Sequence, residues 1–229
     1  MCEVLDTFRR NPEALTGNKS GQGQFSSVMF TPCGKYAVKH SLHGWSDAWL
    51  LYAVKLLTIP KEQRPEWAPM VHSIQINIDS GQFVALMDAY RELGEYDGPT
   101  VNGKLRPLHN YLMLESGEFS DNEPFIPSKD MDGEILVDAA FYPIRECMDF
   151  LRAIELSSGI EFLWDAGGNC MWDEVNGRVI MNDPVAVLDW HSILDTDAHK
   201  EEMQEYILNC AAHAPDLILR RKYEPEGNI

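Results

Sequence analysis

The sequence predicts an α+β fold of two lobes, residues 1–88 and residues 89–229. Two pairs of short β-like runs, at residues 28–39 and 71–87, are each joined by a turn rich in Pro, Gly or Asp and predict an antiparallel sheet. Apolar residues at helical spacing predict long helices at residues 141–154 and 198–212. A hairpin is predicted between these two helices, within residues 162–185.

Composition places the chain among globular proteins with a substantial core, because 45% of its 229 residues are hydrophobic. There is no apolar run of about 18 residues and no charged-then-apolar N-terminal segment, so we expect neither a membrane span nor a secretion signal and place the protein in the cytoplasm. The 5 cysteines are odd in number and never form a Cys-x-x-Cys pair, which argues against a disulfide framework. The pairs His40/His43 and Cys210/His213 each supply two ligands, too few for a closed zinc site.

The formal net charge of -17 excludes a general nucleic-acid-binding surface, because binding to phosphate backbones requires clustered Lys and Arg. The acidic residues are scattered among apolar periodic segments, which favours a solvated surface over imitation of a DNA backbone. Docking onto a basic protein is the other use of such a surface. We therefore expect partners to be proteins with a basic or neutral surface.

A glycine-rich segment precedes the first hairpin. Its residues of interest are Gly21, Gly23, Phe25, Ser26 and Val28. Glycines let the backbone approach a phosphate closely, and a lysine on the adjoining strand, here Lys39 after Ala37, brings positive charge to the same oxygens. Taken alone, the segment is also typical of a flexible surface turn, and Lys39 of an exposed strand lysine.

The helix predicted at residues 45–57 follows this hairpin and contains no Glu. Its one acidic residue, Asp47, lies near the N-terminal end, where it either caps the helix or pairs with the strand lysine. Met87 begins the predicted crossing into the second lobe.

Residues 162–185 hold three polar side chains at fixed places around the predicted hairpin. Asp165 and Asn169 lie in the loop before its first strand, and Asp183 follows its second strand, directly before Pro184. A tight turn is expected at Asn176-Gly177. As purely structural alternatives, Asp165 accepts hydrogen bonds from the following glycines and Asp183 ends a strand.

In this order the motifs resemble the protein-kinase-like superfamily, most closely the early serine/threonine protein kinases of podovirus-type bacteriophages, which shut off host functions. The likeness covers residues 17–185. It rests on Gly-x-Gly-x-Phe-Ser at 21–26, Ala-Val-Lys at 37–39, Gly-Asn at 168–169 and Asn-Asp-Pro-Val at 182–185. It implies a bilobal fold with a small antiparallel-sheet N-lobe and a reduced, mainly helical C-lobe.

The same resemblance implies ATP and Mg²⁺ as cofactors and host proteins as substrates. Lys39 would contact the phosphates, Asn169 and Asp183 would hold magnesium, and Asp165 would be the base or the orienter for a substrate hydroxyl. The remaining nucleotide-binding positions would be Gly21, Gly23, Phe25, Ser26, Val28, Ala37 and Met87, the last of these facing the adenine with its backbone.

Two departures keep other functions open. Asp165 lies four residues before Asn169 where the family has five, and the helix at 45–57 lacks the Glu that pairs with the strand lysine. One alternative is a catalytically impaired pseudokinase whose acidic surface inhibits a basic host protein. Another is a small-molecule phosphotransferase of the aminoglycoside-kinase type.

Overall fold

The computed structural model describes residues 2–17, 20–22, 26–41, 44–94, 96–97, 100–101, 104–105, 117–118, 142–165, 169–187 and 197–220. The chain is α+β and divides into two units. The first holds residues 1–63, 70–89 and 189–229, and the second holds residues 64–69 and 90–188. The break at residues 89/90 adjoins the predicted lobe boundary, whereas the C-terminal segment was predicted in the second lobe and groups with the first.

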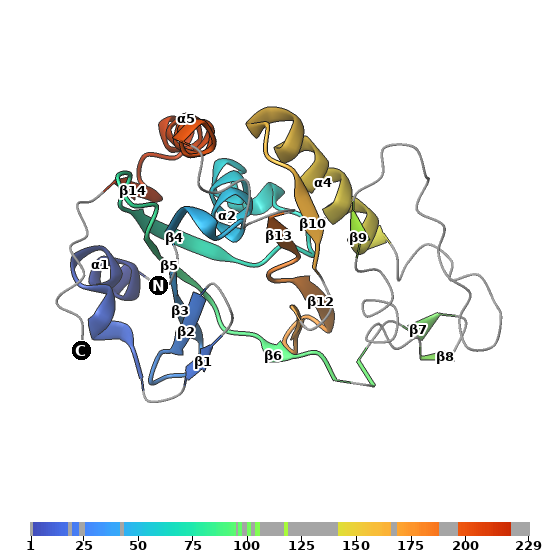
Figure 1. Ribbon diagram of the computed structural model, residues 1–229. Helices are drawn as coiled ribbons and strands as arrows, with labels where there is room; N and C mark the ends of the chain where they lie inside the picture. Colours follow the sequence, from blue (N-terminus) through green and yellow to red (C-terminus); the bar gives the residue numbers. More distant parts are fainter. Residues whose placement is uncertain are drawn as a thin grey trace. The chain divides into compact units, whose positions relative to one another are not determined.

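A mixed sheet with strand order β1-β2-β3-β5-β4-β14 is the centre of the first unit (Figure 1). All neighbouring strands are antiparallel except β14, which pairs parallel with β4, so the predicted antiparallel sheet gains a parallel edge strand. The C-terminal segment is held there because the backbone N–H of Ile74 and the hydroxyl of Ser73 both donate to the carbonyl of Leu217. The strands are β1 (Ser20–Gln22), β2 (Ser26–Phe30), β3 (Tyr36–Ser41), β4 (Val71–Ile76), β5 (Phe83–Asp88) and β14 (Ile218–Arg220).

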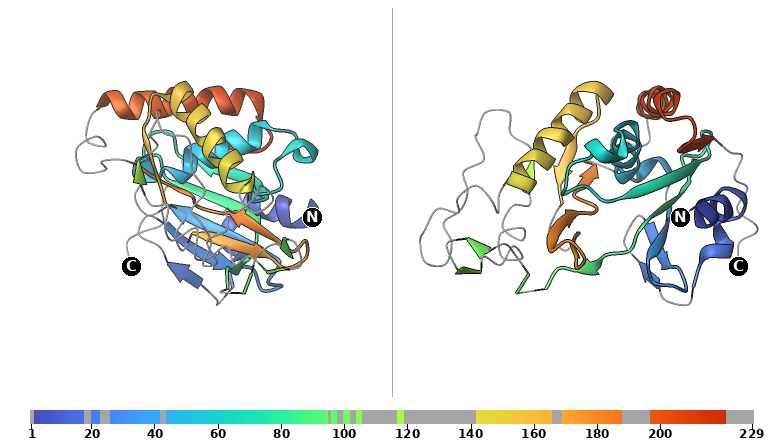
Figure 2. Two further views of the ribbon diagram at one scale, coloured as in Figure 1. Left: turned by 90° about the vertical axis from the view of Figure 1, so that its right-hand side faces the viewer. Right: turned by 180° about the vertical axis from the view of Figure 1, so that it is seen from behind.

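Helix α1 (Cys2–Arg10), followed by the 3-10 turn η1 (Pro12–Leu15), covers one face of this sheet (Figure 2). Phe8 is fully buried against side chains of β3 and β5, among them Val38 and Leu86. The amide of Gln75 donates to the Phe8 carbonyl over 2.5 Å, which ties the helix to β4.

Helix α2 (Trp49–Thr58) packs on the opposite face, together with α5 (Asp197–His213). The predicted helix at 45–57 starts later because residues 44–46 form a separate 3-10 turn, η2 (Gly44–Ser46), in which Gly44 has a φ of 59°. The carboxylate of Asp47 accepts a hydrogen bond of 3.1 Å from the backbone N–H of Trp49, so Asp47 caps the helix. A third 3-10 turn, η3 (Lys61–Gln63), follows α2.

The second unit contains helix α4 (Tyr142–Ser158) and three small sheets of short strands. In the part of this unit that the structure describes, α4 is the one α-helix. The described part is therefore less helical than the mainly helical second lobe that the sequence predicted. The strands are β6 (Arg91–Glu92), β7 (Thr100–Val101), β8 (Lys104–Leu105), β9 (Gly117–Glu118), β10 (Phe162–Trp164), β11 (Cys170–Asp173), β12 (Arg178–Met181) and β13 (Val185–Val187).

The two long helices predicted from periodicity are confirmed as α4 and α5. Gly159, with a φ of 75°, ends α4 as expected, and the carboxylate of Glu155 accepts the N–H of Phe162 to begin β10. A short helix considered at residues 110–114 lies outside the described residues. Among the helices that are described, none combines the length and the apolar character that crossing a membrane requires.

Candidate functional site

One row of residues across the sheet joins the glycine segment to the lysine. In the register of the strands, Gly21 lies opposite Val28, and Val28 lies opposite Lys39. Directly opposed residues share a face of a sheet, so these three residues face the same side. Gly21 has open space around its Cα, whereas Lys39 is buried.

The other predicted nucleotide-binding residues of the described strands lie on this face too. Residues two apart on a strand share a face, so Ser26 joins Val28, Ala37 joins Lys39, and Met87 joins Ala85, which is opposite Lys39. Gly23 and Phe25 lie outside the described residues. The pattern therefore places six of the predicted residues together, one of them the lysine.

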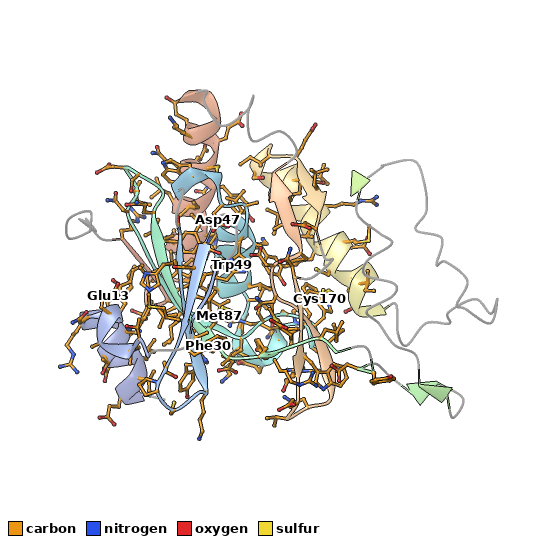
Figure 3. All side chains as sticks on the ribbon, turned by 60° about the horizontal axis from the view of Figure 1, so that its bottom comes forward. Glu13, Phe30, Asp47, Trp49, Met87 and Cys170 are labelled. Carbon is orange, nitrogen blue, oxygen red and sulfur yellow. The ribbon has the colours of Figure 1, made fainter. Side chains whose placement is uncertain are left out.

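Lys39 is not the exposed strand lysine that the sequence left open, because the residue is only 2% exposed. Its ammonium nitrogen lies 4.3 Å from the centroid of the Trp49 ring. Trp49, labelled in Figure 3, is the first residue of α2. Trp49 in turn stacks on Phe83, with ring centroids 5.4 Å apart. Helix α2 contains no acidic residue from Trp49 to Thr58. The aromatic ring of Trp49, the first residue of α2, thus lies against the ammonium of Lys39.

In the second unit, two nested strand pairs form the frame for the three polar residues. The outer pair is β10 with β13 and the inner pair is β11 with β12, both antiparallel. Asp165 directly follows β10, Asn169 directly precedes β11, and Asp183 lies between β12 and β13. Because each residue stands where a strand begins or ends, the pairing brings all three to one end of the frame.

Three hydrogen bonds hold these residues and the neighbouring Pro184 together. The N–H of Asp183 donates to the carbonyl of Asn169 over 3.2 Å, and the side-chain amide of Asn169 donates to the carbonyl of Asp165 over 2.9 Å. The N–H of Asp165 donates to the carbonyl of Pro184 over 2.9 Å. These bonds hold Asp165 and Asn169 close to the segment 183–184. Residues 166–168, which include the glycines proposed as donors to Asp165, lie outside the described part.

The carboxyl groups of Asp165 and Asp183 are close enough to influence each other. Partial burial raises the pKa of the Asp165 carboxyl above its ordinary range, the negative charge of Asp183 raises it further, and a hydrogen bond from Asn169 opposes the rise. A carboxylate with a raised pKa is a better proton acceptor than an ordinary one.

Replacement of Asp165 by Asn is expected to raise the stability of the folded protein slightly at neutral pH, by less than about 1 kcal/mol. A raised pKa means that folding disfavours the charged carboxylate, and the amide removes this cost. Below the ordinary pKa of Asp, about 3.9, the carboxyl is protonated in both states and the difference should vanish. Thermal unfolding of both proteins at pH 7 and pH 3 measures it. Asp149→Asn is the control, because Asp149 is exposed on α4. An Asp165→Asn protein that is less stable than the wild-type protein at pH 7 would contradict the raised pKa of Asp165.

A magnesium ion fits the chemistry of this constellation. The Asn169 amide nitrogen donates to the Asp165 carbonyl, which leaves the amide oxygen to ligate a cation. Asp183, whose backbone N–H is bonded to the Asn169 carbonyl, would supply a carboxylate. Among the described residues, no three His, Cys, Asp or Glu side chains gather into a metal site. Mg²⁺ commonly takes one or two protein oxygens and completes its shell with water and substrate phosphates, so Asn169 and Asp183 suit a nucleotide-bound ion better than a resident one.

Trp67 supports the hairpin and was not singled out in the sequence. Its carbonyl accepts the N–H of Met181, two residues before Asp183, over 2.9 Å. Its indole N–H donates to the carboxylate of Glu146 over 2.9 Å, and its ring meets that of Phe150 edge-on. Segment 64–69 therefore connects α4 to β12, the strand that ends two residues before Asp183. The proline-flanked loop gave no signal for this role beyond the presence of a tryptophan.

The far end of the hairpin is a turn of four residues rather than the two-residue turn expected, since Asp173 is opposite Arg178. The Asp173 carboxylate accepts the backbone N–H groups of Val175 and Asn176 and so organises the turn. Gly177 has a φ of 65°, which explains the glycine.

Cysteine reactivity offers an independent check on the surroundings of Asp165. Burial, and next the charge of Asp165, raises the pKa of the Cys170 thiol to about 12. Cys33 is exposed in the turn between β2 and β3, and hydrogen bonding, first from the Thr31 hydroxyl, lowers its pKa. The thiolate is the nucleophile in alkylation, so the two thiols should react very differently.

We expect iodoacetamide to label Cys33 at least about tenfold faster than Cys170 in the folded protein. Peptide mapping by mass spectrometry after timed quenching separates the two sites. In the Cys33→Ser variant, the rapidly formed alkylated peptide that contains residue 33 should be absent. Cys170 should stay unlabelled until the protein unfolds. Equal labelling of both residues under native conditions would contradict the burial of Cys170.

Compared with known proteins, the chain matches no protein-family model and no curated protein. Its function is therefore argued from the two constellations. Lys39 with its neighbours belongs to the first unit, and Asp165, Asn169 and Asp183 belong to the second.

Proposed function

We propose that the protein is an ATP-dependent phosphotransferase of the protein-kinase-like type, acting on serine or threonine hydroxyls of host proteins. The observation that carries the proposal is the convergence of Asp165, Asn169 and Asp183 at one end of the nested strand pairs. These residues were singled out from sequence as base and magnesium ligands. Their hydrogen bonds hold them together despite the shortened loop.

The first unit supports the same function. Its first five strands have the order β1-β2-β3-β5-β4, with α2 between β3 and β4 in sequence, and Lys39 lies on β3, where protein kinases carry their phosphate-contacting lysine. Gly21, Val28 and Ala37 share its face of the sheet. This face therefore combines a glycine on the edge strand, small or β-branched side chains and the buried ammonium of Lys39. These features suit the binding of a nucleotide whose phosphates lie near the lysine.

Each side chain has a role in the proposed reaction. Asp165 accepts the proton of the attacking hydroxyl and orients its oxygen toward the γ-phosphorus. Lys39 stabilises negative charge on the phosphate oxygens, and Asn169 and Asp183 provide the oxygens that hold magnesium. The bound ion would neutralise charge on the transferring group. The hydroxyl oxygen forms the new P–O bond, and the bond from the γ-phosphorus to the β-phosphate oxygen breaks to release ADP.

The test is nucleotide binding followed by transfer. With magnesium, ATP should raise the unfolding temperature of the protein, and neither ATP nor Mg²⁺ alone should raise it as much. Label from γ-³²P-ATP should then appear on the protein itself or on proteins of a bacterial extract, with Lys39→Ala as the inactive control. Absence of any stabilisation by magnesium and ATP would rule out the proposed function.

A second candidate is a pseudokinase that binds a basic host protein. It is favoured by the sequence of α2, which contains no acidic residue from Trp49 to Thr58. The same pair of assays separates the two candidates. Stabilisation by nucleotide without any label transfer, even to extract proteins, supports the pseudokinase, and label transfer that depends on Lys39 excludes it.

A further inference from the structure

The contact between Lys39 and Trp49 joins two buried groups from different elements. Lys39 points from the centre of β3, between Val28 and Ala85 in the register, and its ammonium lies 4.3 Å from the centroid of the Trp49 ring. Removing an ammonium from water is costly unless other charges or dipoles compensate it. The negative face of an indole provides part of that compensation, and among aromatic side chains it provides the most.

The indole is held rigidly, so it can fix the lysine rather than follow it. Trp49 is 0% exposed and stacks on Phe83 of β5 with an interplanar angle of 22°. Its backbone N–H is held by the Asp47 cap. The ring therefore loses little freedom when the ammonium settles against it, which is the condition for effective preorganisation.

We propose that Trp49 positions the ammonium of Lys39 for a nucleotide phosphate. This inference rests on the proposed nucleotide-binding function. A ring carries no formal charge, so the contact with Trp49 orients the ammonium without neutralising it. Trp49 is thus a positioning residue that acts through Lys39.

A double-mutant cycle on nucleotide affinity tests the proposal. Calorimetric titration with ADP and magnesium is carried out on the full chain, on Trp49→Phe, on Lys39→Met and on the combined variant. Phe keeps the stack on Phe83 but offers a weaker ring face. We expect Trp49→Phe to weaken binding about fivefold when Lys39 is present and to change it less than about twofold in the Lys39→Met background.

Trp45→Phe is the matched control. Trp45 is also a buried indole of this unit, but it packs on the Gly81 turn, where an added Cβ would lie 2.4 Å from its ring. Its replacement should affect nucleotide affinity equally with and without Lys39. If Trp49→Phe also weakens binding equally in both backgrounds, the indole has only a structural role and the proposal is wrong.

Urea unfolding of the same four proteins separates this inference from the proposed function. The effects of the two substitutions on the urea midpoint are expected to be non-additive, because the Lys39–Trp49 contact exists without nucleotide. Additive midpoints would overturn the Lys39–Trp49 coupling even if ADP binds normally. If the midpoints of the four proteins are coupled but the wild-type protein binds no nucleotide, the proposed function is wrong. The positioning role is then wrong too, although the Lys39–Trp49 contact itself is established.

Discussion

Replacement of Asp183 by Asn is expected to lower the rate of phosphoryl transfer by at least about a thousandfold. The amide keeps the shape of the side chain but loses the charge that would hold magnesium beside Asn169. The fold should be retained, because the bond from Asp183 to the Asn169 carbonyl is made by the backbone N–H. The variant also removes the charge that contributes to the raised pKa of Asp165, so the base would become weaker.

Initial rates of label transfer and thermal unfolding, each with and without magnesium and ATP, measure this prediction. Glu174→Gln is the control, since Glu174 is an exposed acid in the turn at the other end of the same hairpin. It should keep the wild-type rate. Asp183→Asn should lose both transfer and the extra stabilisation by magnesium, and transfer at the wild-type rate in this variant would remove Asp183 from the proposed site.

Local patterns in the sequence predicted most of the described elements of the first unit. The alternation at Ile74 and Ile76 and the turn residues at 79–81 were sufficient for the β4–β5 hairpin, because turn chemistry and period-two burial are short-range signals. The parallel strand β14 could not be predicted in this way. Its three residues carry no pattern of their own, and their pairing with β4 depends on residues about 144 positions apart.

The candidate site shows the same division. Asp165, Asn169 and Asp183 were predicted because each adjoins a turn or strand end that is visible in the sequence. The contact of Trp49 with Lys39 was not, since periodicity shows that a residue is buried but not which buried neighbour it meets. Asp47 illustrates the limit well: the sequence offered capping or pairing with the lysine, and the hydrogen bond to Trp49 establishes the cap.

Replacement of Trp67 by Ala is expected to lower the free energy of unfolding of the second unit by about 4 kcal/mol. The residue is 3% exposed, and truncation would leave a cavity beside Phe150 and remove the hydrogen bond to Glu146. Trp67→Phe keeps an aromatic ring beside Phe150 and loses the N–H donor, so it should cost only about 1–2 kcal/mol. Glu146→Ala removes the carboxylate that accepts the indole N–H. Because Glu146 is exposed, this change should lower the free energy of unfolding by about 1 kcal/mol or less.

The position of Trp67 gives this variant a functional consequence beyond stability. Its carbonyl holds the N–H of Met181 on β12, so a backbone that shifts at residue 67 loosens the strand end that presents Asp183. Hydrogen exchange should therefore speed up at the Met181 amide in Trp67→Ala but not at the Val38 amide in the first unit. Nucleotide affinity in the presence of magnesium should fall in step with this local opening. Unchanged exchange at Met181 in a destabilised protein would show that Trp67 stabilises the unit without positioning the metal-ligand strand.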